Sequence, residues 1–352
     1  MKLKYRKDLS FKRWNLLFLS GLILLLLLTG CNKNNSENHK NSEKSPITKS
    51  SFLLNTYVTV TIYDMQDQGI LDECFQLIEM YETIFSRTDP NSELYKLNTK
   101  INQNEKYQIS KELSLLLEKG LYYSKLSEGN FDITIEPVSS LWDFSSNPPR
   151  LPEKDEIQSA ISRVDYKSVI LEDQEVTFLK NGMGFDLGAI AKGYIADQVK
   201  EFLIDKGVGS AIINLGGNVL CLGSKPGGQA FKVGIQKPYA DRNETIAIME
   251  LSDMSVVSSG VYERFFVKDG VSYHHILNPA TGYPLDHGLI SVTIISEKSV
   301  DGDGLSTTCF ALGLEKGLDL INQLPNTYGV FITSDYEIHY SQGFTDAIPL
   351  LK

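Results

Sequence analysis

The sequence predicts an α+β fold with mixed or antiparallel sheets flanked by helices. Runs typical of strands outnumber runs typical of helices. Several strand-like runs form hairpin-like pairs, as at 265–267 and 273–275 on either side of Asp269-Gly270. An apolar content of 42% provides enough material for a core. This combination favours α+β over a doubly wound parallel sheet.

The first half of the chain gives signals for both strands and helices. Residues 57–63 alternate and are β-branched, which predicts a strand, and 70–85 place apolar residues at helical spacing. Ser110 is a candidate cap for a helix that runs to about Leu126. The remaining elements of this half are strands at 131–136 and 168–179, and a glycine-containing turn that leads into a helix over 186–205.

The second half is dominated by strands. They are predicted at 211–214, 231–236, 245–251, 255–258, 264–267, 290–295, 328–333 and 336–340. Helices are predicted at 304–312 and 314–323. No internal repeat is visible, and the proline-rich stretch 145–152 is interpreted as a surface excursion.

The N-terminus carries an export signal. A basic start, an apolar run over 16–28 and the sequence Leu28-Thr29-Gly30-Cys31 predict a lipoprotein signal peptide at 1–30 with lipid on Cys31. An uncleaved membrane anchor is the alternative, although the apolar run is short for a spanning helix. Residues 31–50 are polar and predict a flexible tether to a single domain at 51–352 outside the cytoplasm.

The charge of the chain excludes one class of partner. Formal net charge is −10, and beyond residue 31 the chain holds 28 basic and 43 acidic residues. A general nucleic-acid binder needs a basic face, so we expect no nucleic-acid partner. An anionic substrate would also be repelled, unless a metal ion, a lysine or a helix N-terminus compensates locally.

The three cysteines beyond the lipobox do not suggest a metal or disulfide framework. Cys74, Cys221 and Cys309 are odd in number and form no CxxC spacing. We interpret them as small buried hydrophobic residues, and one disulfide among them remains an alternative.

One candidate metal site lies in the segment 301–308. Asp303 and Thr307 are four residues apart, so they share a face of a helix. A carboxylate and a hydroxyl are hard oxygen ligands suited to Mg²⁺, which completes its shell with water and substrate phosphate. The alternative is that Asp303 only caps the helix start.

Two further segments contain candidate functional groups. Near Gly188, Ala189 can expose a backbone carbonyl to a cation and Lys192 can balance a pyrophosphate; the alternative is a plain turn. His275 follows a strand and is a candidate proton acceptor, or a structural histidine that bonds a loop carbonyl. P-loop, GxGxxG, GxSxG and HExxH signatures do not occur.

Eight segments in order resemble the ApbE family of FAD:protein FMN transferases over roughly 51–345. They are FSRTDPNSELYKLN (85–98), SEGNFDITIEPVSSLWDF (127–144), DLGAIAKGYIAD (186–197), INLGGNV (213–219), VGIQKP (233–238), VVSSGVYERFF (256–266), HILNPATGYP (275–284) and DGLSTTCFALG (303–313). Eight landmarks in order are far more specific than any one of them.

The resemblance implies a T-fold-like single domain that binds FAD as substrate, with Mg²⁺, or alternatively Mn²⁺, against its pyrophosphate. Asp303, Thr307 and the Ala189 carbonyl fall at the metal-binding positions, and His275 at the catalytic position. The positions that contact the flavin nucleotide correspond to Leu54, Thr88, Asn130, Phe131, Asp132, Asp186, Lys192 and Ile276.

The implied reaction splits FAD, attaches FMN by a phosphoester to a threonine of an exported acceptor protein, and releases AMP. Members of this family are often exported lipoproteins, in agreement with the N-terminus.

Three departures stand out from the family pattern: Leu54-Asn55-Thr56 in place of Met-Gly-Thr, Asn278 in place of Asp, and Thr88 in place of an aromatic residue. A small side chain at 88 leaves the nucleotide more open to water. An FAD pyrophosphatase that yields free FMN and AMP is therefore one alternative, and a flavin-binding lipoprotein without turnover is another.

Overall fold

A computed structural model describes residues 45–241 and 244–351. Lys44–Lys352 form one compact unit. The signal peptide, Cys31 and residues 31–44 of the tether lie outside the described residues. Within the described ranges, no helix is both long and apolar enough to cross a membrane.

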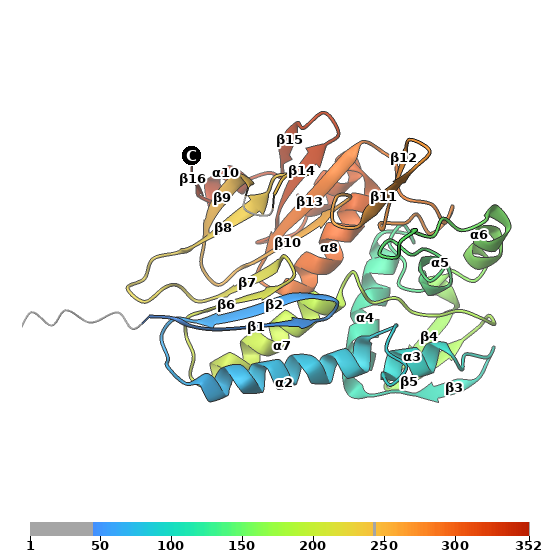
Figure 1. Ribbon diagram of the computed structural model, residues 1–352, viewed down its shortest axis with the longest axis horizontal. Coiled ribbons are helices and arrows are strands. Elements are labelled where there is room, and N and C mark those ends of the chain that lie inside the picture. The colour runs from blue at the N-terminus through green and yellow to red at the C-terminus, as the bar shows by residue number, and fades with distance from the viewer. Residues whose placement is uncertain (1–44, 242–243, 352) are drawn as a thin grey trace, which may run out of the picture. The chain divides into compact units, whose positions relative to one another are not determined.

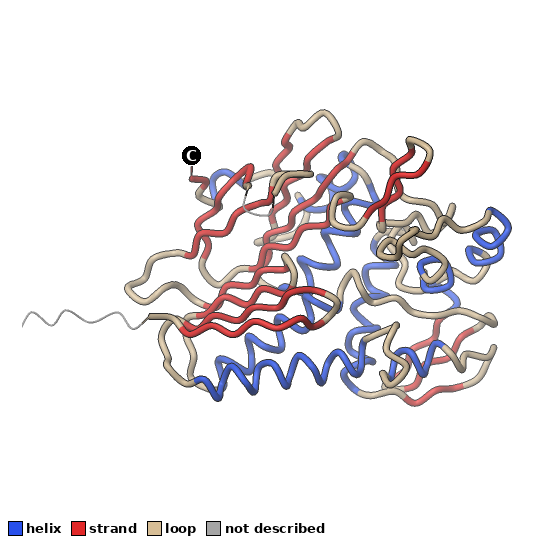
Figure 2. The backbone as a smooth tube through the Cα atoms, viewed as in Figure 1, coloured by secondary structure: helices blue, strands red, loops and turns tan. Residues whose placement is uncertain are grey.

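The centre of the fold is an eight-stranded antiparallel sheet (Figures 1 and 2). In spatial order its strands are β1 (Ile47–Leu53), β2 (Thr56–Ile62), β6 (Ala211–Leu215), β7 (Asn218–Leu222), β10 (Ser255–Gly260), β13 (Leu289–Ser296), β14 (Tyr328–Thr333) and β15 (Ile338–Tyr340). All neighbouring pairs are antiparallel. The predicted α+β class with antiparallel sheets is confirmed.

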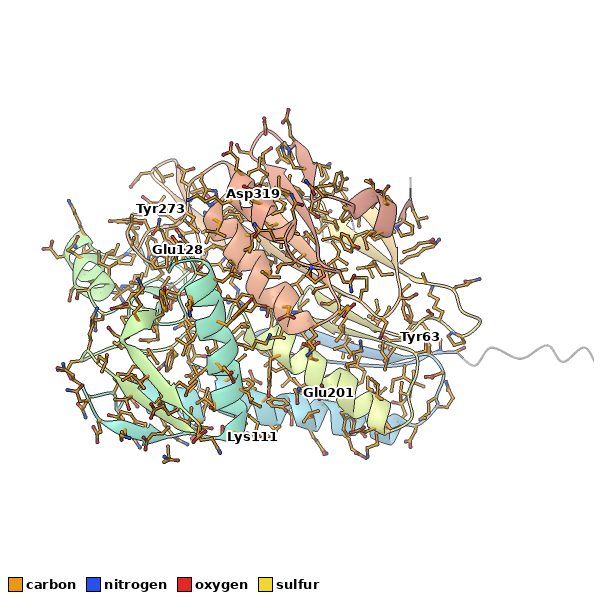
Figure 3. The ribbon with its side chains drawn as sticks, turned by 180° about the vertical axis from the view of Figure 1, so that it is seen from behind. Tyr63, Lys111, Glu128, Glu201, Tyr273 and Asp319 are labelled. Atoms are coloured by element: carbon orange, nitrogen blue, oxygen red, sulfur yellow. The ribbon has the colours of Figure 1, made fainter. Side chains whose placement is uncertain are left out.

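Helices cover one face of this sheet, and Figure 3 shows them in front when the molecule is viewed from behind. They are α2 (Gln68–Phe85), α7 (Ala191–Asp205), α8 (Ser299–Leu312) and α9 (Leu314–Ile321), with α4 (Lys111–Leu126) packed against α8 and α2. Every residue of β13 is buried. On one side β13 packs against α8 in the main hydrophobic core, and on the other side it packs in a second hydrophobic core.

The second core lies between the large sheet and a small one. The small sheet consists of β8 (Phe231–Gln236), β9 (Thr245–Leu251) and β16 (Leu350–Leu351), next to α10 (Phe344–Ala347). Phe231 and Met249 from this sheet pack with Val256 and Ile295 of the large sheet. Because strands alternate their side chains, β13 contributes to both cores, with Ile294 in the first and Ile295 in the second.

The remaining elements form smaller units. They are β3 (Lys106–Gln108), β5 (Glu175–Phe178) and β4 (Val169–Glu172) in one sheet, the hairpin β11 (Phe265–Lys268) and β12 (Val271–His274), the helices α3 (Glu93–Asn98), α5 (Glu136–Ser139) and α6 (Lys154–Ile161), and the 3₁₀ turn η1 (Tyr166–Ser168). The predicted hairpin around Asp269-Gly270 is confirmed.

Helices α7 and α8 touch at a glycine. A Cβ on Gly193 would lie 2.3 Å from the backbone oxygen of Ser299, so only glycine permits this approach. The contact brings the N-terminal turn of α7 to the first two turns of α8, and this crossing positions the candidate site.

Most predicted elements are confirmed, and two differ. The strand predicted at 168–179 is a hairpin of two strands, β4 and β5. Residues 131–135 form turns instead of a strand, and α5 follows at Glu136. The side chain of Asp132 accepts hydrogen bonds from the backbone N–H and the hydroxyl of Thr134, at 2.8 and 2.7 Å. Such local bonds offer the backbone an alternative to a strand ladder.

Two predicted boundaries differ from the structure. Strand β1 begins at Ile47, so residues 47–50 of the predicted tether pair with β2 instead of remaining flexible. Helix α8 begins at Ser299, five residues before the predicted start at 304. In both places tertiary contacts supply stability that the local sequence does not indicate.

All three described cysteines are free and buried. Burial raises the pKa of the Cys74 and Cys221 thiols to about 12, so these groups stay protonated at neutral pH. The interpretation as buried hydrophobic residues is confirmed.

Candidate active site at the crossing of α7 and α8

Asp303 is the centre of the site. It lies in the second turn of α8 and is only 3% exposed. Its Oδ2 accepts a hydrogen bond of 2.9 Å from the backbone N–H of Gly193, 110 residues away. Gly193 is the third residue of α7, and the cap position Ile190 has no side-chain hydrogen bond. Asp303 therefore satisfies an N-terminal donor of another helix instead of capping its own.

Lys192 adds a positive charge beside this carboxylate. Its ammonium lies 3.6 Å from Oδ1 of Asp303 and donates a hydrogen bond of 3.0 Å to the carbonyl oxygen of Gly188. Lys192 thus joins the turn that contains Ala189 to helix α8. The predicted turn before α7 is confirmed. Lys192, which follows this turn, faces Asp303 as well as solvent.

Thr307 lies one turn beyond Asp303 on α8, as the spacing predicts. Its hydroxyl is 2.9 Å from the hydroxyl of Ser259 on β10, which also lies 2.8 Å from the hydroxyl of Ser306. The three hydroxyls hold the Thr307 oxygen in place on the side of α8 that faces β10.

Asp186 is held in an ionised state at the start of the same turn. Its Oδ2 lies 2.9 Å from Nε of Arg87 and accepts a 2.7 Å bond from Ser139, while Oδ1 accepts from the N–H of Gly188 at 3.0 Å. Burial alone would raise the pKa of this carboxyl, but Arg87, these bonds and Arg264 lower it below its ordinary value.

His275 is held at the foot of the β11–β12 hairpin. Its backbone N–H donates to the carbonyl oxygen of Arg264 at 3.1 Å, and its Nδ1 lies 3.2 Å from the same oxygen. A carbonyl can only accept, so Nδ1 carries the proton of the neutral ring and Nε2 keeps its lone pair. Desolvation, Arg264 and Lys192 lower the pKa of His275 to about 4, so the ring is a neutral base at physiological pH.

His274 points to the other face and has a structural role. Its Nε2 lies 2.8 Å from the carbonyl oxygen of Leu285, and its Nδ1 accepts from the N–H of Ile276 at 3.3 Å. Both ring nitrogens are occupied by backbone groups. Ile276 is itself buried.

The segment that contains Asn130, Phe131 and Asp132 lies next to Asp186. The N–H of Asp186 donates to the carbonyl oxygen of Ile133 at 2.8 Å. Asn130 donates to the carbonyl oxygen of Ser127, Phe131 is buried, and the Asp132 carboxylate accepts from Thr134 and from the N–H of Tyr166. The Asp132 carboxylate thus joins the turn at Thr134 to the start of η1 at Tyr166.

Leu54 and Thr88 lie at the edge of this region. Leu54 adopts φ 54° in the β1–β2 turn, and its N–H donates to Glu82 at 2.9 Å. Thr88 is exposed and follows Arg87, the partner of Asp186. Within the described residues, neither of them hydrogen-bonds to Asp303, and Ala189 makes no hydrogen bond to Thr307.

Three residues of the site were not singled out by sequence reasoning. Arg87 pairs with Asp186, Arg264 holds His275 through its carbonyl, and Ser259 contacts Thr307. All three lie inside the landmark segments 85–98 and 256–266. Their position in those segments is the only feature of the sequence that could have identified them, because an isolated arginine or serine forms no recognisable spacing pattern.

The described residues contain no group of three or more His, Cys, Asp or Glu side chains able to hold a metal ion. A hard cation that binds few protein ligands does not require such a cluster. Asp303 supplies a buried carboxylate whose Oδ1 lies 3.6 Å from the ammonium of Lys192, and Thr307 supplies a fixed hydroxyl one turn away. This donor set fits Mg²⁺.

The sequence and the fold match one family of known proteins. A model described as the ApbE family matches residues 54–332. A protein of Treponema pallidum named FAD:protein FMN transferase is 32% identical over 322 residues, which cover 86% of this chain and 89% of that protein. A protein of the same name from Klebsiella pneumoniae is 35% identical over 291 residues, covering 82% and 90%.

Solved structures agree on the fold. The crystal structure of the ApbE protein of Thermotoga maritima has a TM-score of 0.77 and 30% identity, covering 86% of this chain and 98% of that one. The flavin transferase ApbE of Vibrio cholerae has a TM-score of 0.77 at 23% identity, which shows the shared fold.

Proposed function

The chain belongs to the ApbE family, and on that basis we propose that it is a Mg²⁺-dependent FAD:protein FMN transferase. It cleaves FAD, attaches FMN through a phosphoester to a threonine of an exported acceptor protein, and releases AMP. The observation that carries the proposal is the contact of Asp303 with Gly193 and Lys192, which unites two distant family segments in one site.

Asp303, Thr307 and the Ala189 carbonyl are the residues that would hold Mg²⁺, with Mn²⁺ as an alternative. When bound, the cation neutralises charge that develops as the phosphoanhydride breaks. The chain outside the N-terminal segment is strongly acidic, so local positive charge is needed to bind a pyrophosphate.

The residues of the chain have distinct roles in this reaction. Lys192 and Arg264 bring positive charge to the site, and both act on the pKa of His275, which places them within electrostatic reach of it. Nε2 of His275 accepts the proton of the incoming threonine hydroxyl. The threonine oxygen then bonds to the phosphorus of the FMN half, and the anhydride oxygen leaves with AMP. Help from a general base is typically worth about 10²–10⁴-fold in rate.

We also propose that the enzyme is a lipoprotein anchored through Cys31, with its catalytic domain outside the cytoplasm. The basic start, the apolar run and the lipobox support this location. The acceptor would then be a protein exposed on the same side of the membrane, and FAD would have to be present there.

The proposal is tested by incubating the full chain in detergent with FAD, Mg²⁺ and extracytoplasmic proteins of the same cells. We expect flavin fluorescence on an acceptor band in a denaturing gel, FMN mass on one of its threonines, and AMP in solution. EDTA and the Asp303→Ala variant should abolish these signals. His275→Ala should bind FAD and transfer FMN about 10²–10⁴-fold more slowly.

Three results would contradict the proposal. Transfer that persists in EDTA and in Asp303→Ala would remove the metal site. AMP release with free FMN and no labelled protein would show a pyrophosphatase instead, an alternative favoured by the small, exposed side chain of Thr88. FAD binding with no AMP at all would show a flavin-binding protein without turnover.

A further inference from the structure

A second aspartate connects the two helices of the site. Asp197 lies on α7, one turn beyond Gly193, and is half-buried. Its Oδ1 accepts from the N–H of Ser299 at 2.8 Å and its Oδ2 from the N–H of Val300 at 2.9 Å. These are the first two residues of α8, whose own cap position Lys298 makes no side-chain hydrogen bond.

The two helices therefore exchange caps. Asp197 on α7 satisfies the N-terminal donors of α8, and Asp303 on α8 satisfies an N-terminal donor of α7. On each helix the backbone N–H that donates and the aspartate that accepts lie about one turn apart: Gly193 and Asp197 on α7, and Val300 and Asp303 on α8. Because Gly193 allows the backbones to touch between these two contacts, the exchange fixes both the separation of the helices and their register.

We propose that Asp197 is a positioning residue for the metal site: by fixing the start of α8 against α7, it places the carboxylate of Asp303 relative to Lys192 and the Ala189 turn. This inference rests on the proposed Mg²⁺ site. It assigns a task to a residue whose two carboxylate oxygens both accept hydrogen bonds from the backbone of α8.

The energetics of Asp197 favour this role over a purely stabilising one. Burial, together with the nearby charge of Asp301, raises its pKa to about 6, although the hydrogen bonds from Val300 and Ser299 and the charge of Lys200 act in the opposite direction. An ionised carboxylate in this place is therefore a poor source of stability. What it provides is two hydrogen bonds with defined direction at the start of α8.

A merely structural cap exists elsewhere on the chain and provides a matched control. Asp67 is the N-cap of α2 and accepts from the N–H of Gly69 at 2.8 Å, in an exposed position. Asp67→Ala removes a helix cap of the same chemistry. Any effect that both variants share is due to helix stability, and an effect limited to Asp197 is due to position.

The test is a titration of the full chain in detergent with Mn²⁺ alone, followed by electron paramagnetic resonance. Asp197→Asn keeps the shape of the side chain, but its amide can accept only one of the two N–H groups. We expect it to bind Mn²⁺ about 10-fold more weakly than the unaltered chain, as altered supports of metal ligands typically do. Asp67→Ala should lower the thermal midpoint and leave Mn²⁺ affinity unchanged.

Asp197→Glu is the second variant, because it keeps both acceptors and the charge but displaces them by one methylene. Weaker Mn²⁺ binding in either Asp197 variant, with Asp67→Ala unaffected, supports the inference. Unchanged Mn²⁺ affinity in a folded Asp197 variant, or an equal loss in Asp67→Ala, overturns it. Failure of the unaltered chain to bind Mn²⁺, or equal binding by Asp303→Ala, would instead refute the proposed metal site.

Discussion

Single residues in this site acquire their chemistry from neighbours that are distant in sequence. His275 shows this most clearly, because the carbonyl oxygen of Arg264 fixes which ring nitrogen carries the proton. The sequence identifies a histidine after a strand, with a base or a structural residue as alternatives. Only the fold shows that His274 takes the structural role and His275 keeps a free nitrogen.

The lowered pKa of His275 predicts an unusual pH profile. Since its pKa is about 4, the ring loses its basic form only as the pH falls toward that value, instead of near the ordinary value of about 6.5. We therefore expect kcat/KM for FMN transfer to change little between pH 8 and 6 and to fall below about pH 5. Stopped assays with the folded state monitored at each pH would measure this.

Arg264→Gln provides the matching variant, because the charge of Arg264 lowers the pKa of His275. In this variant the fall of kcat/KM at low pH should occur at a higher pH than in the unaltered enzyme. Arg150→Gln, which removes an exposed ion pair elsewhere, should leave that fall where it is. An acid limb near pH 6.5 in the unaltered enzyme would exclude His275 in this state as the base.

The departure from Met-Gly-Thr at 54–56 also has an explanation at this scale. Leu54 and Asn55 both have positive φ, at 54° and 56°, as a two-residue hairpin turn requires. Glycine meets this requirement without strain, and asparagine tolerates it better than most residues. Asn55 can therefore stand where relatives often have glycine, while Leu54 is strained by this conformation.

At the scale of elements, periodicity predicts the helices and strands whose stability is local. Helices α2 and α4 and strands β2, β6, β8, β9, β13 and β14 are confirmed close to their predicted bounds. The start of α8 was missed because the sequence Asp301-Gly302-Asp303-Gly304 is typical of a loop. There the glycines allow close packing, since a Cβ on Gly304 would lie 2.5 Å from the ring of Tyr123.

Strands β1 and β7 are not predicted from the sequence, because contacts with other elements stabilise them. Strand β1 lies in a polar segment and is stabilised by pairing with β2 over seven residues. Strand β7 follows the Gly216-Gly217 turn and pairs with β6 and β10. Neither has a clear alternating pattern of its own, so pairing partners decide the structure.

The contact between α7 and α8 gives a prediction about stability. Gly193→Ala places a Cβ 2.3 Å from a backbone oxygen, so the helices must separate. We expect a loss of about 1–3 kcal/mol in the free energy of unfolding, measured by urea denaturation, together with weaker Mn²⁺ binding.

Gly69→Ala is the control for this helix substitution. Its Cβ would meet only the end of the exposed Asp67 side chain, at 3.1 Å, and alanine favours helix by up to about 1 kcal/mol. It should leave stability unchanged or raise it. Equal stability of the Gly193→Ala and Gly69→Ala proteins would contradict the close packing of α7 on α8.

At the scale of the whole molecule, the charge distribution and the N-terminal segment define where the enzyme would work. Because the chain is acidic, binding of an anionic substrate needs positively charged side chains at the site. Three separate segments bring Lys192, Arg87 and Arg264 there. The sequence indicates that such compensation is needed. It cannot locate the arginines, because their convergence depends on the folding of the whole domain.

The lipobox gives a prediction about location. Cys31→Ala removes the sulfur that would carry the lipid, so the protein should leave the washed membrane fraction or accumulate with its signal peptide uncleaved. Fractionation followed by immunoblotting measures both outcomes. An unchanged size and membrane association in the variant would favour a membrane anchor that does not depend on lipid.

The position of the cation tests the central proposal most directly. Crystals of the protein soaked with Mn²⁺ and FAD can be measured at an X-ray energy where manganese scatters anomalously. We expect one strong anomalous peak at about 2.0–2.3 Å from oxygens of Asp303, Thr307 and Ala189, beside the pyrophosphate. A peak elsewhere with FAD bound, or bound FAD whose pyrophosphate lies far from Asp303, would contradict the proposed site.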